Sequence, residues 1–273
     1  MLKSMTGFGR CEIATEEYKI SVEMKAVNHR YLDLSIKMPK KFNYFEASIR
    51  TLLKQYIQRG KVDLFITYED YTEEKMAAQF HIDNDIRVSD LARYPDVLMM
   101  EQVPEDEEHM WAILKEAVTE AASRFVETRV KEGENLKADL LAKLDHMAVL
   151  VREIEERSPA IVAEYRQKLE EKVKELLSGT AIDDGRIAAE VTIFADKICT
   201  DEETVRLKSH IEATKTELLS GGSVGRKLDF IAQEMNREAN TILSKANDLE
   251  VSDKAIALKT EIEKVREQIQ NIE

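Results

Sequence analysis

Residues 18–27, YKISVEMKAV, alternate apolar and polar side chains along most of their length. A period of two is typical of a half-buried β-strand and differs from the spacing of a helix. The stretches MTGFGRCEIAT (5–15) and YLDLSIKM (31–38) repeat the pattern on either side, and KVDLFITYED (61–70) follows them. The start of the chain is therefore predicted to form a small antiparallel sheet, with its strands arranged as a meander.

A helix is expected between the third and fourth strands. Residues 42–58, FNYFEASIRTLLKQYIQ, carry apolar side chains at helical spacing, and Pro39 and Gly60 bound this stretch. Beyond Met110 the pattern is almost wholly helical, which makes the predicted fold class α+β. The expected helices cover residues 108–157, 160–178, 184–199, 201–219, 225–247 and 252–271, with breaks at Pro159, SGTAIDDG and SGGSVG.

The pattern also predicts how the chain is divided. The expected parts are an N-terminal α+β domain (1–107), a long-helix arm (108–180) and a C-terminal helical domain (181–273). At the start of one C-terminal helix, Thr200 and Glu203 have the spacing of a capping box. In this motif the Thr200 hydroxyl accepts a hydrogen bond from the Glu203 N–H, and the Glu203 carboxylate accepts one from the Thr200 N–H.

The composition of the chain argues against several classes of protein. The 273 residues carry a formal net charge of −13, which argues against a broad electrostatic footprint for nucleic acid but not against a local basic groove. Cys11 and Cys199 lie far apart, so neither a disulfide framework nor a thiolate zinc site is indicated. MLKSMTGFGR lacks the apolar core of a signal peptide and no stretch approaches membrane-spanning length, so we expect a cytoplasmic protein without membrane association.

Residues 225–248, GRKLDFIAQEMNREANTILSKAND, are expected to form a helix with an unusual polar side. The apolar stripe is Leu228, Ile231, Met235, Ala239, Ile242 and Ala246. The opposite side carries Arg226, Asp229, Gln233, Arg237, Asn240 and Ser244, and a second polar row carries Glu234, Glu238, Thr241 and Lys245. Asp, Asn and Ser lower helix propensity, so a face that keeps them is expected to contact something, either a polar subunit interface or a ligand.

The preceding helix adds ionisable groups at helical spacing. Glu203, Arg206, His210, Thr214 and Glu217 share one face of residues 201–219. A histidine among carboxylates can help to ligate Mn²⁺ or Mg²⁺, can transfer protons, or can be a structural residue. The short SGGSVG turn predicts that this helix and the next are antiparallel neighbours, which brings the two polar faces together.

A second polar and aromatic group occurs near the N-terminus. It contains Arg10, Asn28, His29, Arg30 and Tyr31, followed by RGKVD at residues 59–63. Such side chains can stack on RNA bases or pair with them. Roles in turns and at strand ends explain them equally well.

Five stretches together carry a family resemblance: KSMTGFGR, VNHRYLD, VSDLARYPDVL, DEETVRLKSHIEATK and GRKLDFIAQEMNREANTILSKA. They resemble the YicC/YloC family of bacterial proteins over both ends of the chain and most of its middle. The resemblance implies a metal-dependent endoribonuclease of RNA turnover that acts on single-stranded RNA and assembles as a homohexamer around a central cavity. Near Phe80 and His81 the chain is shorter than the family pattern.

The resemblance also singles out positions of this chain, and the roles among them are inferred. The implied ligands of Mn²⁺ or Mg²⁺ are His210 and Glu203 with Glu234 or Glu238. The implied catalytic residues are His210, Glu203, Glu234, Arg237 and Gln233. The implied RNA-binding residues are Arg226, Lys245, Asn240, Arg206, Arg10 and Arg30.

Two questions stay open at the level of sequence. RNA cleavage can proceed by metal-assisted attack of water, or by internal attack of the 2′-hydroxyl with His210 or His29 as base. The competing hypothesis is a non-catalytic RNA-binding or scaffold protein whose polar helix faces build a ring. It accounts for the long charged helices and for the lack of a recognisable metal-ligand spacing.

Overall fold

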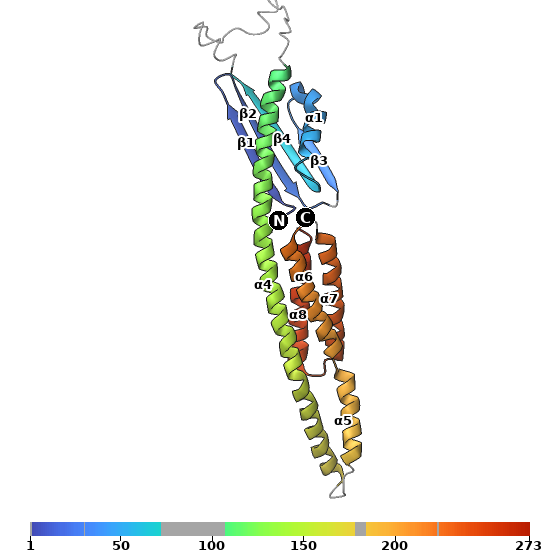
Figure 1. Cartoon of the computed structure of the whole chain (residues 1–273). Helices are drawn as coiled ribbons and strands as arrows, with labels where there is room; N and C mark the ends of the chain where they lie inside the picture. Colours follow the sequence, from blue (N-terminus) through green and yellow to red (C-terminus); the bar gives the residue numbers. More distant parts are fainter. Residues whose placement is uncertain (1, 30, 72–106, 178–183, 223) are drawn as a thin grey trace, which may run out of the picture. The chain divides into compact units, whose positions relative to one another are not determined.

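The computed structural model describes residues 2–29, 31–71, 107–177, 184–222 and 224–273. Within these residues a small sheet comes first and long helices follow, which confirms the predicted α+β class (Figure 1). The segment around Phe80 and His81 lies outside the described residues. The strands are β1 (Gly7–Ala14), β2 (Tyr18–Val27), β3 (Leu32–Lys37) and β4 (Gly60–Asp70).

The sheet is mixed, so the predicted antiparallel meander is wrong in its last strands. The strand order is β1-β2-β4-β3, and β3 pairs in parallel with β4 while the other pairs are antiparallel. The physical reason is the connection between β3 and β4, which contains the 3-10 helix η1 (Lys40–Phe45) and the helix α1 (Glu46–Leu53). A helical crossover of this length returns the chain to the end where β3 began, which parallel pairing requires.

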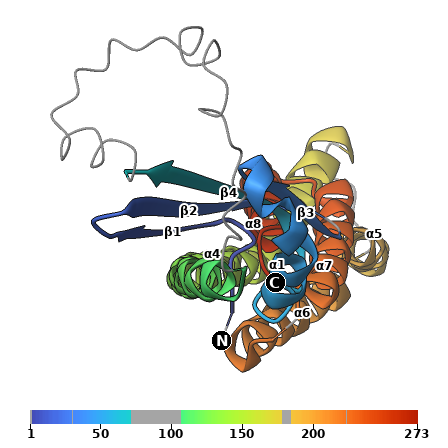
Figure 2. The same ribbon diagram turned by 90° about the horizontal axis from the view of Figure 1, so that it is seen from above.

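One face of the sheet carries the core of its unit. Alternate strand residues, among them Val22, Met24 and Leu64, are almost fully buried and pack with η1, α1 and the first part of α4 (Glu107–Leu177). In Figure 2, α1 and α4 lie on the same side of the sheet. Helix and sheet approach closely at Gly9, where a Cβ would lie 2.2 Å from the Ala121 carbonyl oxygen, so only glycine fits.

The remaining helices form a second unit with the far part of α4. They are α5 (Asp184–Ile198), α6 (Asp201–Ser220), α7 (Gly225–Lys245) and α8 (Leu249–Ile269). Leu2 belongs to the core of this unit, Ser4 pairs with Ile272, and the Glu273 N–H donates to the Lys3 carbonyl at 2.9 Å. None of the helices in the described ranges has an apolar run that would span a bilayer.

Contacts divide the chain into residues 5–132 and residues 1–4 with 133–273, so α4 contributes to both units. This division follows the contacts between residues, whereas the three parts expected from the sequence follow the type of secondary structure. The two divisions describe different things, so the three predicted domain boundaries stay a prediction.

Pro159 does not end a helix, so the predicted break there is wrong. α4 continues through it from Glu107 to Leu177. A proline inside a helix removes one backbone hydrogen bond and costs about 3 kcal/mol. Contacts on both sides of it offset that cost, because Ile154 is buried in the core and Ile161 packs against it.

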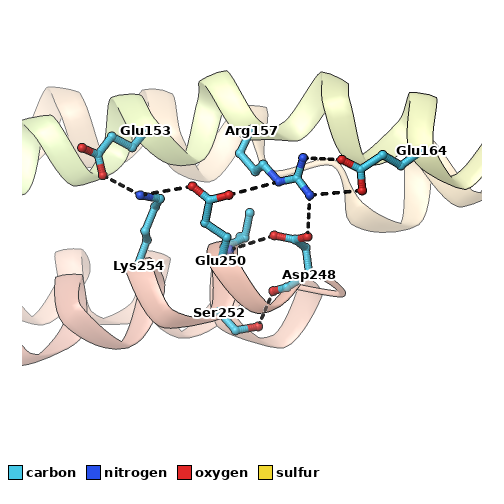
Figure 3. A network of polar contacts seen from close by, with 8 residues as sticks. Glu153, Arg157, Glu164, Asp248, Glu250, Ser252 and Lys254 are labelled. Carbon is cyan, nitrogen blue, oxygen red and sulfur yellow. Dashed lines mark hydrogen bonds and ion pairs between the residues drawn. The ribbon is translucent and has the colours of Figure 1, made fainter.

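Arg157 also bridges the proline. Its guanidinium donates to both carboxylate oxygens of Glu164, at 2.6 and 3.2 Å, and to Asp248 Oδ2 at 2.9 Å (Figure 3). Asp248 is the N-cap of α8 and accepts the Val251 N–H at 3.1 Å. One arginine therefore links both sides of Pro159 to the turn between α7 and α8.

The Asp248 carboxylate generates a prediction about pH. Its hydrogen bond with Arg157 holds the pKa of this carboxyl below its usual value. A depressed pKa means that the stabilisation is present above the unfolded-state pKa of about 4 and is lost as pH falls through the folded-state value. Asp248→Asn keeps a capping side chain but should lower the urea midpoint at neutral pH, with a difference from wild type that shrinks as the pH falls below about 4.

Asp253→Asn is the matched control, because Asp253 is exposed on the same helix. It should change the urea midpoint little at either pH. If Asp248→Asn lowers the urea midpoint equally at neutral and at acid pH, the assigned role of the Asp248 charge is contradicted.

Candidate functional site

The two sides of α7 differ as the sequence predicts. Leu228, Ile231, Met235, Ala239 and Ile242 are buried in the core of the helical unit. The residues predicted to share the opposite face are exposed or half-buried. The predicted apolar stripe is therefore confirmed for these five positions, and Ala246 packs against the same core.

A shallow hollow of about 530 Å³ lies over the polar side of α7. Its lining is amide, hydroxyl and guanidinium groups: Gln233, Asn236, Arg237, Asn240, Thr241, Ser244 and Arg266. Four of these belong to the face singled out from the sequence. Arg226 is exposed on the same helix but does not line the hollow.

Hydrogen bonds hold much of this surface in place. Gln233 donates to Asp229 at 2.9 Å, and Arg266 of α8 contacts the other Asp229 oxygen at 3.3 Å. Asn240 donates to Asn236 at 3.0 Å, and Asn236 in turn bonds to a glutamate of α8. Arg237 is 72% exposed, and its only ion pair in the described part of the chain is a weak contact of 3.8 Å with Glu234.

α6 and α7 are antiparallel neighbours, as the short turn predicts. Arg206 of α6 lies 3.5 Å from Glu238 of α7, and Lys245 of α7 lies 2.8 Å from Glu203 of α6. The carboxylates of both pairs are buried, with side chains 5% and 9% exposed, whereas Arg206 is 51% and Lys245 34% exposed. Each helix thus supplies one buried anion and one more exposed cation to the other, and Arg206 also pairs with the exposed Glu202 of its own helix.

Glu203 has a different role from the one predicted. Thr200 is the N-cap of α6, but its side chain makes no capping hydrogen bond, so the capping box is wrong. Glu203 Oε1 instead accepts Lys245 Nζ, which also donates to the Cys199 carbonyl at 2.9 Å. The Lys245 ammonium competes successfully because it satisfies a buried charge, and the hydrogen bond to Glu203 raises the pKa of Lys245.

His210 falls at the level of Glu234 across the two helices. Arg206 of α6 pairs with Glu238 of α7, and Glu217 of α6 pairs with Lys227 of α7. Residue numbers therefore rise along α6 as they fall along α7, by the same amount. By this register, position 210 is opposite position 234. His210 is half-buried, and the Glu234 side chain is 31% exposed.

The described residues do not gather the expected metal ligands. No cluster of three or more His, Cys, Asp or Glu side chains in these ranges is arranged to hold an ion. Glu203 Oε2 is buried without a hydrogen-bond partner, but the other oxygen is bound to the Lys245 ammonium. The Lys245 ammonium at this carboxylate is an unfavourable neighbour for a metal ion. The predicted ligand set of His210 and Glu203 with Glu234 or Glu238 stays a prediction.

The N-terminal candidates lie in the sheet unit. Arg10 is on the open face of the sheet and pairs with Glu12 at 2.9 Å and with Glu23 at 3.5 Å. These pairs neutralise it, so Arg10 does not provide an unpaired cation for RNA. Arg30 lies outside the described residues.

Sequence reasoning missed two lining residues of the hollow, whereas Thr241 belongs to the second polar row that it predicted. Asn236 neighbours the predicted face at helical spacing, so a wider stripe on the same helix would have included it. Arg266 comes from α8, and its place depends on the pairing of α7 with α8. No spacing within α7 signals it.

These groups can bind and polarise a phosphodiester. Exposed arginines complement phosphate charge, amides orient polar groups, and a histidine beside a carboxylate can transfer a proton. The fold and site therefore define an α+β protein whose helical unit carries a polar surface with side chains of the kinds that bind phosphate.

The comparisons with known proteins give the family. Residues 2–138 match the family described as Endoribonuclease YicC-like, N-terminal region, and residues 154–273 match Endoribonuclease YicC-like, C-terminal. A relative named Probable endoribonuclease YicC from Clostridioides difficile is 41% identical over the whole of both chains, and one of the same name from Haemophilus influenzae is 31% identical, also over the whole of both. The chain belongs to the YicC-like endoribonuclease family.

The Glu203–Lys245 pair generates a prediction about stability. Lys245→Met leaves a buried carboxylate without its cation, which should cost roughly 2 kcal/mol in the free energy of unfolding, given the partial exposure of the lysine. Adding Glu203→Gln removes the buried charge and should recover more than half of that loss. Urea denaturation followed by far-UV circular dichroism measures both.

Arg166→Met is the control, since Arg166 is 64% exposed and pairs with Glu170, which is 37% exposed, on α4. Loss of a pair of this kind should change stability by less than about 0.5 kcal/mol. Equal losses in Lys245→Met and Arg166→Met would show that burial of Glu203 is energetically unimportant.

Proposed function

We propose that the protein is an endoribonuclease that cleaves single-stranded RNA at the polar surface of α7 and its seam with α6. The observation that carries the proposal is the hollow of about 530 Å³, lined by amides, hydroxyls and arginines on a helix whose other side is core. Membership of the YicC-like endoribonuclease family supports RNA as the substrate. Turnover of cellular RNA is the corresponding role.

Roles for individual residues follow from their positions. Arg237 and Arg226 are exposed cations that bind the phosphates of the strand. Gln233 and Asn240 orient the phosphate and the attacking oxygen through their amides. His210 takes the proton of that oxygen as its bond to phosphorus forms, and Glu234, at the same level of the seam, stabilises the imidazolium. The bond from phosphorus to the leaving oxygen breaks, and that oxygen takes a proton from water.

The seam also provides a second row of cations. Lys245 and Arg206 stand at the surface beside their buried carboxylates and add positive charge along the path of the strand. Glu203 and Glu238 hold these cations in place. The cations are therefore preorganised, which lowers the cost of ordering them when RNA binds.

A divalent cation, Mn²⁺ or Mg²⁺, remains part of the proposal as a requirement to be tested. We assign no step to it, because the described His, Cys, Asp and Glu side chains of one chain do not gather around an ion. Loss of cleavage in EDTA with recovery on adding Mn²⁺ or Mg²⁺ supports the requirement. Cleavage unchanged in EDTA contradicts it.

We further propose that the protein self-associates, as a homohexamer. Large apolar side chains of the helical unit are exposed in the single chain, among them Val205, Leu219 and Phe230, each 63% or 64% exposed. Apolar residues mark an interface where they form a contiguous patch, and these residues are proposed to lie at contacts between copies. Multi-angle light scattering should give about six times the mass of one chain, and a monomer in dilute solution at physiological salt would contradict the proposal.

Cleavage of labelled single-stranded RNA tests the site directly. His210→Ala should lower the cleavage rate by roughly 100-fold or more, as expected for loss of an acid–base group. Arg237→Ala should lower it through lost charge stabilisation in the transition state. His146→Ala and Arg152→Ala are matched controls, because both residues are exposed on α4 and should leave the rate unchanged.

The product ends identify the reaction. A 2′,3′-cyclic phosphate indicates attack by the 2′-hydroxyl, whereas a 5′-phosphate indicates attack by water. If His210→Ala and Arg237→Ala keep the wild-type mass and cleave RNA at the wild-type rate, the site assignment is wrong. RNA binding without any cleavage by the wild type would favour a non-catalytic RNA-binding or scaffold ring.

A further inference from the structure

A cluster of polar, aromatic and basic side chains occupies one end of the sheet. β2 ends at Val27, and β3 and β4 begin at Leu32 and Gly60, which are paired in register. The residues around these strand ends include His29, Tyr31, Arg59 and Lys61, which we call the sheet-end cluster. None of the proposed cleavage residues belongs to it.

Backbone contacts hold the cluster in a defined arrangement. Arg59 Nε donates to the His29 carbonyl at 3.1 Å, which leaves its two terminal nitrogens for another partner. His29 Nδ1 lies 3.0 Å from the Tyr31 carbonyl oxygen and 3.3 Å from the Tyr31 nitrogen, so its Nε2 takes no part in this turn. A guanidinium anchored in this way loses little freedom when it binds an anion.

Tyr31 is the apolar part of the cluster. It is 63% exposed, and its backbone is fixed by the contacts with His29. A large aromatic ring at the surface, beside the start of β3, is a platform on which an unpaired base can stack. Tyr31 lies at the surface of the sheet unit and outside its core cluster.

The charge at this end differs from that of the open sheet face. On the open face Arg10, Lys19 and Lys25 each pair with a glutamate within 4 Å. At the sheet end, described residues 27–33 and 54–61 contain the cations Lys54, Arg59 and Lys61 and one carboxylate, Asp33. No ion pair among the described residues neutralises these three cations, although the whole chain carries a net charge of −13.

We propose that the sheet-end cluster is a second binding site for single-stranded RNA, outside the site of cleavage. One base stacks on Tyr31, and the adjoining phosphate binds the terminal nitrogens of Arg59 with Lys61 beside them. His29 Nε2 faces the same ligand. The inference rests on the proposed function, since it adds a contact for the same substrate.

This contact should make the protein bind unpaired RNA more tightly than duplex RNA. Stacking on Tyr31 requires a base that is free of its partner strand, whereas phosphate contacts alone do not distinguish single strands from duplexes. The sheet-end cluster therefore selects single strands before any bond is cleaved.

Fluorescence anisotropy of the full chain with fluorescein-labelled oligouridine in EDTA tests this proposal. Gel electrophoresis afterwards checks that the oligonucleotide is intact. Tyr31→Ala should weaken binding by about 5- to 150-fold, the range that corresponds to loss of one stacked base, and Tyr31→Phe should bind as wild type does. Tyr44→Ala is the control, because Tyr44 is an exposed tyrosine of η1, 48% exposed, away from the cluster.

Salt dependence tests the phosphate contact. Arg59→Ala should weaken binding and reduce the slope of log Kd against log salt by about 0.7, the value for one phosphate contact on a single strand. Lys25→Ala, which removes a cation that pairs with Glu23 on the open face, should leave the slope unchanged. A labelled RNA duplex should bind Tyr31→Ala and wild type equally.

The outcomes separate this inference from the proposed cleavage. If wild type binds oligouridine and both Tyr31→Ala and Arg59→Ala bind it as tightly, the sheet-end site is wrong while the cleavage site stands. If Tyr31→Ala loses affinity for duplex and single strand alike, base stacking is wrong. If wild type binds no RNA at all, both proposals fail.

Discussion

Two buried carboxylates fix how α6 and α7 lie against each other. Glu203 and Glu238 each need a cation from the opposite helix, and a buried charge without a partner is costly. Sliding one helix along the other would break both pairs together, so the register is specified more strongly than apolar packing alone would specify it. Every other feature of the candidate site depends on that register, because it decides which residues of α7 face outward and which residue of α6 stands opposite Glu234.

The same pairs explain how an acidic chain presents positive charge. Glu203 and Glu238 lie inside the seam, and Lys245 and Arg206 are the more exposed members of the two pairs, while Arg206 also pairs with the exposed Glu202 of its own helix. On the open face of the sheet the arrangement differs, since Arg10 and its neighbours pair with glutamates that are themselves partly exposed. A buried carboxylate leaves its cation as the more exposed member of the pair, whereas an exposed carboxylate offsets the charge of its cation at the surface itself.

The sequence predicts those parts of the fold that depend on local patterning. The alternation in YKISVEMKAV and the 3.6-residue period of α7 both reflect burial on one side, so strands, helices and the apolar stripe follow directly. The parallel pairing of β3 with β4 does not follow, because it depends on where the crossover places the strand. The continuity of α4 through Pro159 depends on Arg157 meeting Asp248, which is 91 residues away along the chain. In the site, the face of α7 was predictable, whereas Arg266 and the Glu203–Lys245 pair depend on the packing of whole helices.

The shared helix α4 has a consequence for the order of folding during synthesis. The sheet unit uses residues 5–132, so all of its strands and its part of α4 have been made once the chain is half complete. The helical unit must wait for α8, and Leu2, which belongs to its core, must wait with it. At typical rates of synthesis this delay is roughly seven to thirty seconds. During that time the first residues of the chain and the unpaired apolar side of the second part of α4 are the segments that a chaperone would protect.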